Sequence, residues 1–197
     1  MNKPDDEPLL VSCGIFREEL ARLGPVVMSQ ARPVFLDSMM HMHPSKLDKI
    51  LQGMAQNEDR RLLLVYGDCC PHMGELAALP NVRKVRGINC CDIILGHDAY
   101  RQLRRKGAFF FMPEWTSRWE QIFQIELGLK NQQLAREFMH EMHRRLIYLD
   151  TGLTVIPHET LADIGAFFDM HVEIQPVGLE QLKISVLDEM RRLKQHA

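Results

Sequence analysis

Short apolar runs recur along the first part of the chain, and each run predicts a β-strand. Leu62–Tyr66 is apolar at every position, which is typical of a strand that is covered on both faces. Val82–Arg86 is more polar, so we expect it near an edge of the sheet. The predicted strands are, in order, Leu9–Ser12, Pro33–Leu36, Leu62–Tyr66, Val82–Arg86 and Phe109–Met112.

Segments with the apolar spacing of a helix lie between these runs. Ser45–Gln56 has four apolar residues at i, i+3, i+4 and i+7 spacing, and it follows Pro44, a residue that favours a first helical turn. The other helices predicted in this way are Phe16–Leu23, Met73–Leu79, Cys91–Lys106, Thr160–Phe168 and Leu179–Lys194.

The pattern changes after Met112. Ser117–Leu149 predicts one long helical stretch, interrupted near Gly128, because its second half carries an i, i+4 stripe of Leu134, Phe138, Met142 and Leu146. Asp150-Thr151-Gly152 ends this stretch. We expect brief strands to follow at Thr154–Ile156 and Val172–Ile174.

Strands that alternate with helices predict an α/β fold with a largely parallel sheet. Right-handed crossovers would place helices on both faces, in a Rossmann-like, three-layer arrangement with a long helix in the C-terminal half of the chain. We expect residues 1–8 to form a disordered N-terminal tail and residues 9–197 to form a single α/β domain.

Charge and hydropathy narrow the classes of function. The chain has 197 residues, with 24 Lys and Arg against 26 Asp and Glu, and this balance argues against a nucleic-acid binder. No apolar run approaches the roughly 20 residues of a membrane helix. The polar N-terminus lacks the apolar core of a secretory signal. We therefore expect a cytoplasmic protein with no nucleic-acid and no membrane partner.

The five cysteines include two adjacent pairs. Their odd number and the expected reducing compartment argue against a disulfide framework. No C-x-x-C motif is present, so neither a zinc ribbon nor a thioredoxin-type redox motif is indicated.

The position of the reactive side chains is more informative than their number. Every cysteine and the only His-x-His motif lie just past the carboxyl end of a predicted strand. Ligands of open parallel sheets bind at that edge, so we expect these segments to converge there. In chain order they are Cys13, then His41 and His43, then Cys69 and Cys70, and last Cys90 and Cys91.

Thiolate and imidazole are the ligands that zinc prefers. We expect His41, Cys69 and Cys90 to bind a metal ion, with Cys13 or His43 as a fourth ligand. Zinc is the first choice on ligand chemistry. Three protein ligands with an open position would indicate catalysis, whereas four would indicate a structural site. The alternative is that buried free cysteines act only as small hydrophobic residues.

The remaining candidates flank this set. Cys70 and Cys91 are less favoured as ligands, because adjacent residues rarely reach one metal. Asp68 and Glu114 are the candidate catalytic residues, as an acid or base or as groups that orient a ligand. Cys69 would face the N-terminus of the following helix, which favours the thiolate form.

Ordered motifs along most of the chain, from Leu9 to Leu193, resemble a bacterial and archaeal family known as domain of unknown function 1638. Cys70 and Cys91 depart from the family pattern, since glycine is expected at the first position and no thiol at the second. The motifs are C-G-I at Cys13–Ile15, H-x-x-P-x-x-L at His41–Leu47, Y-G-x-C at Tyr66–Cys69, C-x-x-x-x-x-G at Cys90–Gly96, an aromatic run ending in Trp115, and D-T-G at Asp150–Gly152.

The resemblance implies a role beside corrinoid-dependent methyltransferase systems, and therefore in methyl or one-carbon transfer. Three functions stay open. The first is a zinc-dependent transferase that activates a thiol or water. The second is a non-catalytic accessory or metal-delivery protein, which would meet the corrinoid only through a partner corrinoid protein or methyltransferase. The third is a thiol redox protein that uses Cys69 with Cys70 or Cys90.

Overall fold

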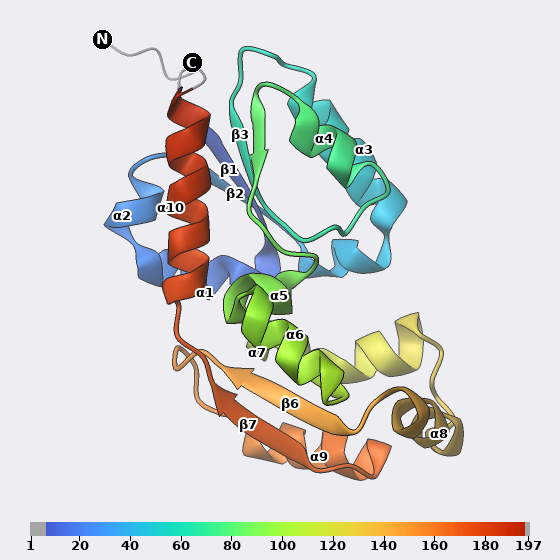
Figure 1. The fold of residues 1–197 in the computed structure, drawn as a ribbon. Helices are drawn as coiled ribbons and strands as arrows, with labels where there is room; N and C mark the ends of the chain where they lie inside the picture. Colours follow the sequence, from blue (N-terminus) through green and yellow to red (C-terminus); the bar gives the residue numbers. More distant parts are fainter. Residues whose placement is uncertain (1–6, 196–197) are drawn as a thin grey trace. The chain divides into compact units, whose positions relative to one another are not determined.

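The structure is a computed structural model that describes residues 7–195, apart from the side chain of Met28. Its elements gather into two compact units, which are Met1–Gly96 with Leu179–Ala197, and His97–Gly178. Figure 1 traces the chain through both units. A single domain over residues 9–197 therefore stays a prediction.

The predicted tail lies mostly outside the described residues, which begin at Glu7. Pro8, the last residue of that tail, is buried. Its carbonyl accepts a hydrogen bond from the backbone N–H of Arg32 at 2.8 Å.

The first unit is built on a parallel sheet of β1 (Leu9–Cys13), β2 (Arg32–Leu36), β3 (Leu62–Val65) and β4 (Val82–Lys84). The strand order is β2-β1-β3-β4, so β4 lies at an edge, as its polar sequence predicts. The chain runs from β1 to β2 on one side and then returns to β3 on the other. This reversal makes a topological switch point between the carboxyl ends of β1 and β3.

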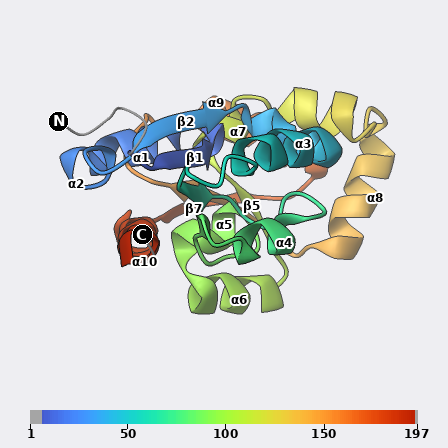
Figure 2. The same ribbon diagram turned by 90° about the horizontal axis from the view of Figure 1, so that it is seen from above.

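Helices cover both faces of this sheet, which confirms the predicted α/β class (Figures 1 and 2). The helix α10 (Glu180–Gln195) packs on β3 and β4, while α3 and α4 lie on the opposite side. Helix α10 is the long helix in the C-terminal half of the chain. The other helical segments of this unit are η1 (Gly14–Phe16), α1 (Arg17–Leu23), α2 (Pro25–Met28), η2 (Ser38–Met42), α3 (Pro44–Ala55), α4 (Met73–Ala78) and α5 (Cys90–Leu95).

The helix predicted over Cys91–Lys106 is wrong as a single element. It is divided into α5 and α6 (His97–Arg105) by Gly96, whose φ of +79° favours glycine. The first of these helices begins one residue earlier than predicted, at Cys90. Asn89 caps it by accepting a hydrogen bond from the backbone N–H of Asp92 at 2.9 Å.

The second unit holds a parallel sheet of β5 (Ala108–Phe111), β6 (Arg145–Asp150) and β7 (Val172–Pro176) in that order. Its core includes edge-to-face ring contacts, such as Phe123 with Phe168 at 5.0 Å between centroids. The helical segments are α6, α7 (Pro113–Thr116), a π-helical segment η3 (Gln121–Glu126), α8 (Gln132–Met142) and α9 (His158–Phe168).

The long helix predicted over Ser117–Leu149 is wrong. The segment contains η3, α8 and the central strand β6. Gly128 breaks it with a φ of +70°, and Asn131 caps the start of α8 by accepting from the backbone N–H of Leu134. Leu146 is fully buried in β6 and only happens to continue the i, i+4 stripe of α8.

The apolar i, i+4 stripe of α8 does not form the buried face of that helix, although its spacing predicts this. Leu134, Phe138 and Met142 are exposed, whereas Ala135 and Met139 form the buried face of α8. The strand predicted at Thr154–Ile156 is wrong too, because these residues lie in a bend and loop before α9.

Among residues 7–195, no helix combines the length and apolar character that crossing a bilayer requires.

Two loops at the carboxyl edge of the first sheet are held together through Gly67. A Cβ added at Gly67 would lie 2.4 Å from Cα of Asn89 and 2.5 Å from the carbonyl oxygen of Ile88. The neighbouring Asp68 N–H donates to that same carbonyl at 2.9 Å. Only glycine permits this approach, and the approach brings the segments that carry Cys69 and Cys90 side by side.

A second anchor holds the loop between β3 and α4. The Asp48 carboxylate on α3 accepts the His72 side-chain Nδ1–H at 2.8 Å and the His72 backbone N–H at 3.2 Å. It also accepts from Gln52 Nε2 at 2.8 Å and from the Cys70 thiol. Cys70 therefore fastens the loop, and hydrogen bonding with His72 lowers the pKa of Asp48 while raising that of His72.

We expect Gly67→Ala to destabilise the protein by about 3 kcal/mol, since its new methyl group would overlap backbone that cannot move aside cheaply. Gly53→Ala is the matched control, because Gly53 lies within α3 with open space around it. There alanine should stabilise the helix by up to about 1 kcal/mol. Urea unfolding measures both, and equal stability of the two variants would contradict the contact.

The Asp48–His72 pair should make stability depend on pH. The pKa of His72 is raised in the folded state, so the pair stabilises the fold fully below the unfolded-state pKa of His72, about 6.5. This stabilisation is lost as the pH rises through the folded-state pKa. The pKa of Asp48 is lowered in the folded state, so its stabilisation of the fold is lost only in acid, as the pH falls through that folded-state pKa. The melting-temperature advantage of wild type over His72→Gln should therefore be larger at about pH 5.5 than at about pH 9. An advantage that grows with pH would reverse the assignment.

Candidate functional site

Three cysteines of the first unit meet at the switch point of its sheet. Cys13 ends β1, Cys69 follows β3 in the adjoining position, and Cys90 is the first residue of α5. The thiols of Cys13 and Cys90 share a hydrogen bond, and the Cys69 thiol interacts electrostatically with both. These three residues are the thiol cluster.

The thiol cluster is a poor environment for negative charge. Burial, reinforced by the neighbouring Cys13 thiol, raises the pKa of Cys69 to about 11. The hydrogen bond with Cys13, together with burial, raises the pKa of Cys90 well above its usual range. The expectation that a helix N-terminus favours the Cys69 thiolate is wrong, because α4 begins only at Met73 and desolvation outweighs any dipole.

Tyr66 places a hydroxyl among these thiols. It follows β3 directly, is 2% exposed, and its hydroxyl has no hydrogen-bond partner. Burial, followed by the charges of Cys13, Cys90 and Cys69, raises the pKa of the phenol far above its usual range.

Lys84, the last residue of β4, supplies positive charge nearby. Its ammonium donates to the carbonyls of Val85 at 3.1 Å and Gly87 at 2.9 Å, and pairs with Asp68 Oδ1 at 3.1 Å. This charge acts to lower the pKa of Cys69, against the larger effect of burial. Asp68, one of the predicted catalytic residues, has a side chain that is 57% exposed and held by this pair.

The predicted histidines lie on a neighbouring element. His41 belongs to η2, and His43 is the residue just before α3. Both side chains are exposed, although partial burial of its ring lowers the pKa of His41. The contacts that define the thiol cluster join Cys13, Cys69 and Cys90, so that a ligand role for His41 stays a prediction.

The other candidates have separate places. The Cys70 thiol donates a hydrogen bond to Asp48. Burial, together with this hydrogen bond, raises the pKa of Cys70 to about 12. Cys91 lies next to Cys90 in α5. Glu114, the second predicted catalytic residue, belongs to the second unit, where Oε1 pairs with Arg118 at 3.2 Å and Oε2 is buried without a hydrogen-bond partner.

Within residues 7–195, no group of three or more His, Cys, Asp and Glu side chains has the arrangement of a metal site. The donor chemistry of the thiol cluster nevertheless suits a thiophilic metal, since three sulfur atoms lie within interaction range of one another. Coordination would require the thiols to lose their protons and to turn toward a common point.

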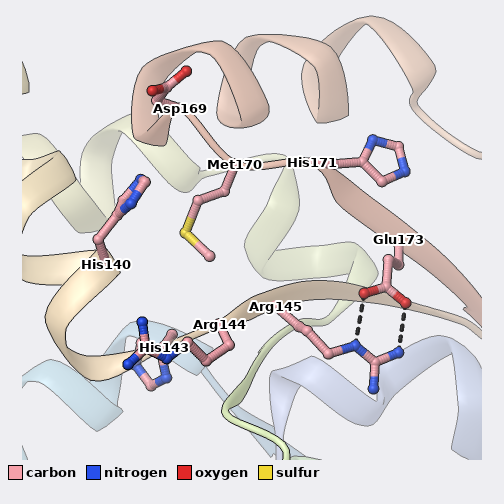
Figure 3. Close-up of a pocket in the computed structure, with 8 residues that line it drawn as sticks. All are labelled: His140, His143, Arg144, Arg145, Asp169, Met170, His171 and Glu173. Atoms are coloured by element: carbon pink, nitrogen blue, oxygen red, sulfur yellow. Dashed lines mark hydrogen bonds and ion pairs between the residues drawn. The ribbon is translucent and has the colours of Figure 1, made fainter.

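The second unit contains a polar cavity of about 410 Å³ at the amino ends of β6 and β7 (Figure 3). Three of its polar side chains are engaged within the unit. Arg145 makes a bidentate pair with Glu173 at 2.7 and 2.5 Å, and His140 Nε2 donates to the carbonyl of Phe168 at 2.9 Å. We therefore regard the thiol cluster, with its unpaired hydroxyl, as the better candidate site.

Sequence reasoning found the three cysteines but missed Tyr66 and Lys84. Both residues lie at the carboxyl ends of strands, which is the signal that identified the cysteines. Tyr66 was assigned to the strand, and Lys84 to an exposed edge.

Comparison with known proteins adds one finding. No curated protein and no solved structure matches the sequence. Residues 35–186 match the family described as "Protein of unknown function (DUF1638)", a range that contains Tyr66, Cys69 and Cys90. Since the match covers well over half of the chain, the protein belongs to the DUF1638 family.

Proposed function

We propose that the protein binds a thiophilic divalent metal ion, with zinc as the first choice, through the thiolates of Cys13, Cys69 and Cys90. The observation that carries this proposal is the meeting of these three thiols at the switch point of the first sheet. Open parallel sheets bind their ligands at that position.

The electrostatics of the thiol cluster support a cation. Burial and mutual repulsion oppose three thiolates in one place, and a divalent metal ion offsets both effects. The same raised pKa values argue against a free thiolate acting as a nucleophile by itself at neutral pH. All three thiols were among the predicted ligands, and a ligand role for His41 stays a prediction.

Three protein ligands leave a fourth position open to an outside ligand. A metal ion there would lower the pKa of a bound thiol, which is the chemistry that methyl transfer to sulfur requires. A metal-dependent transferase in methyl or one-carbon transfer is accordingly the activity we propose. A corrinoid protein or methyltransferase as partner, and the cytoplasm as the reducing compartment that keeps these thiols free, belong to the same proposal.

A thiol redox protein is the second candidate. The hydrogen bond between the thiols of Cys13 and Cys90 favours it, because it pairs the two sulfur atoms that would have to join. Oxidation would form one disulfide bond, release two protons, and pass two electrons to an acceptor such as a low-molecular-weight disulfide.

Cys69→Ser should abolish zinc binding and leave the fold intact, since it removes one of three ligands and changes a single atom. Protein purified without oxygen and treated with zinc is analysed for bound metal, with circular dichroism to check folding. Wild type should retain a single zinc ion, and Cys69→Ser less than about a tenth of that amount. Cys91→Ser is the matched control, because Cys91 lies next to a proposed ligand without being one.

Zinc uptake that is the same in Cys69→Ser and Cys91→Ser would remove Cys69 from the ligand set. Failure of the wild type to take up any zinc would remove the metal proposal. Reversible loss of two titratable thiols upon oxidation, abolished in Cys90→Ser, would then favour the redox candidate.

A further inference from the structure

The cavity at the amino ends of β6 and β7 lies entirely within the second unit, and the proposed metal site does not involve it (Figure 3). Its volume of about 410 Å³ is in the range of sites that bind small molecules. Apart from Met170, all the residues that line it have a charged or an imidazole side chain. Such a lining suits a small polar ligand better than an apolar one.

Two of the basic groups in this cavity have a structural role. Arg145 is held by its bidentate pair with Glu173. His140 donates its Nε2–H to the carbonyl of Phe168, the last residue of α9. Carbonyls at the end of a helix lack donors within the helix, and basic side chains commonly supply them. Neither group is therefore a sign of a ligand.

Arg144 is different, because its guanidinium makes no hydrogen bond and no ion pair within residues 7–195 (Figure 3). The start of its side chain is nevertheless confined. The Arg144 backbone N–H donates to the carbonyl of Gly107 at 2.8 Å, and a Cβ added at Gly107 would lie 2.8 Å from Cγ of Arg144. The guanidinium itself is exposed and offers a fork of donors to an outside acceptor.

His143, the neighbouring residue, supplies one more donor. Its side chain is 8% exposed and its ring lies edge-on to that of Phe109, with 5.0 Å between centroids. Arg104 Nη1 donates to Nδ1 of His143 at 3.5 Å, and since a guanidinium can only donate, Nδ1 is the acceptor. Burial and the charge of Arg104 lower the pKa of His143, so the neutral ring has its proton on Nε2. Within the described residues, no hydrogen bond uses this Nε2–H.

Donors and charges together limit the class of ligand. A guanidinium fork and one imidazole N–H match the two oxygen atoms of a carboxylate. A phosphate would bring further oxygen atoms and a second negative charge. Asp169 and Glu173 on the cavity wall oppose that second charge, as do the carboxyl ends of α8 and α9. A singly charged carboxylate therefore fits this cavity better than a phosphate does.

We propose that this cavity binds a small polar carboxylic acid, whose carboxylate pairs with the Arg144 guanidinium and accepts a hydrogen bond from Nε2 of His143. The site is separate from the thiol cluster, since all its residues belong to the second unit. It does not depend on the proposed metal, and binding of the acid can be measured whether or not a metal ion is present.

The test is an NMR titration of the isotope-labelled, full-length protein with lactate as the probe. Lactate should shift the resonances of residues around the cavity, including the His143 ring, whereas its neutral amide, lactamide, should not. Arg144→Gln removes the charge and keeps the first two carbons of the side chain, and we expect it to raise the Kd for lactate about tenfold. Arg144→Lys keeps the charge without the fork and should also bind lactate more weakly than wild type.

Arg105→Gln is the matched control variant. Arg105 is an exposed arginine at the end of α6, and it does not line the cavity. This variant loses the same charge from the same unit, so an unchanged Kd for lactate would show that the effect of Arg144→Gln comes from the cavity rather than from the overall charge.

Three results would overturn the proposal. The first is a wild-type protein in which lactate leaves the resonances around the cavity in place. The second is an equal Kd for lactate in Arg144→Gln and Arg105→Gln, which would remove Arg144 from the site. The third is tighter binding of inorganic phosphate or of lactamide than of lactate, since either would exclude a carboxylate as the class of ligand.

Discussion

Backbone contact at Gly67 is the constraint on which the candidate site depends. The loop after β3 lies against Ile88 and Asn89 so closely that a Cβ has no room. Asp68 then pairs its N–H with the carbonyl of Ile88, and Cys69 and Cys90 follow at fixed distances along each segment. Cys13 joins them because β1 is the neighbour of β3 in the sheet. The thiol cluster is thus a product of backbone packing more than of attraction between side chains.

The two members of the Cys69–Cys70 pair have different roles despite their adjacency. Both residues lie in the loop between β3 and α4, where Cys69 contributes to the thiol cluster while Cys70 donates a hydrogen bond to Asp48 on α3. Both thiols are neutral at ordinary pH, the first mainly through burial and the second through burial with an acceptor carboxylate. Neutral thiols resist indiscriminate oxidation, and a metal ion can replace their protons.

Strand positions and the gathering of the cysteines could be predicted from the sequence, because apolar runs mark buried strands and parallel strands share an edge. β6 could not be predicted in this way, since Leu146 continued the helical spacing of α8 while belonging to a different element. The helix break at Gly96 was also missed, because glycine within an apolar pattern does not reveal its φ. His41 follows β2, the direct neighbour of β1, so its ligand role stays a prediction; strand order, which no local pattern contains, is what places β1 between β2 and β3.

The first unit is assembled from both ends of the chain, and α10 alone comes from the C-terminal end. On a ribosome, β3 and β4 would emerge long before the helix that packs on them. Residues 97–178 form the second unit from one continuous stretch, so they can fold first. The thiol-bearing sheet would have to wait, with the face that α10 covers still exposed, until residues 180–195 have been synthesised.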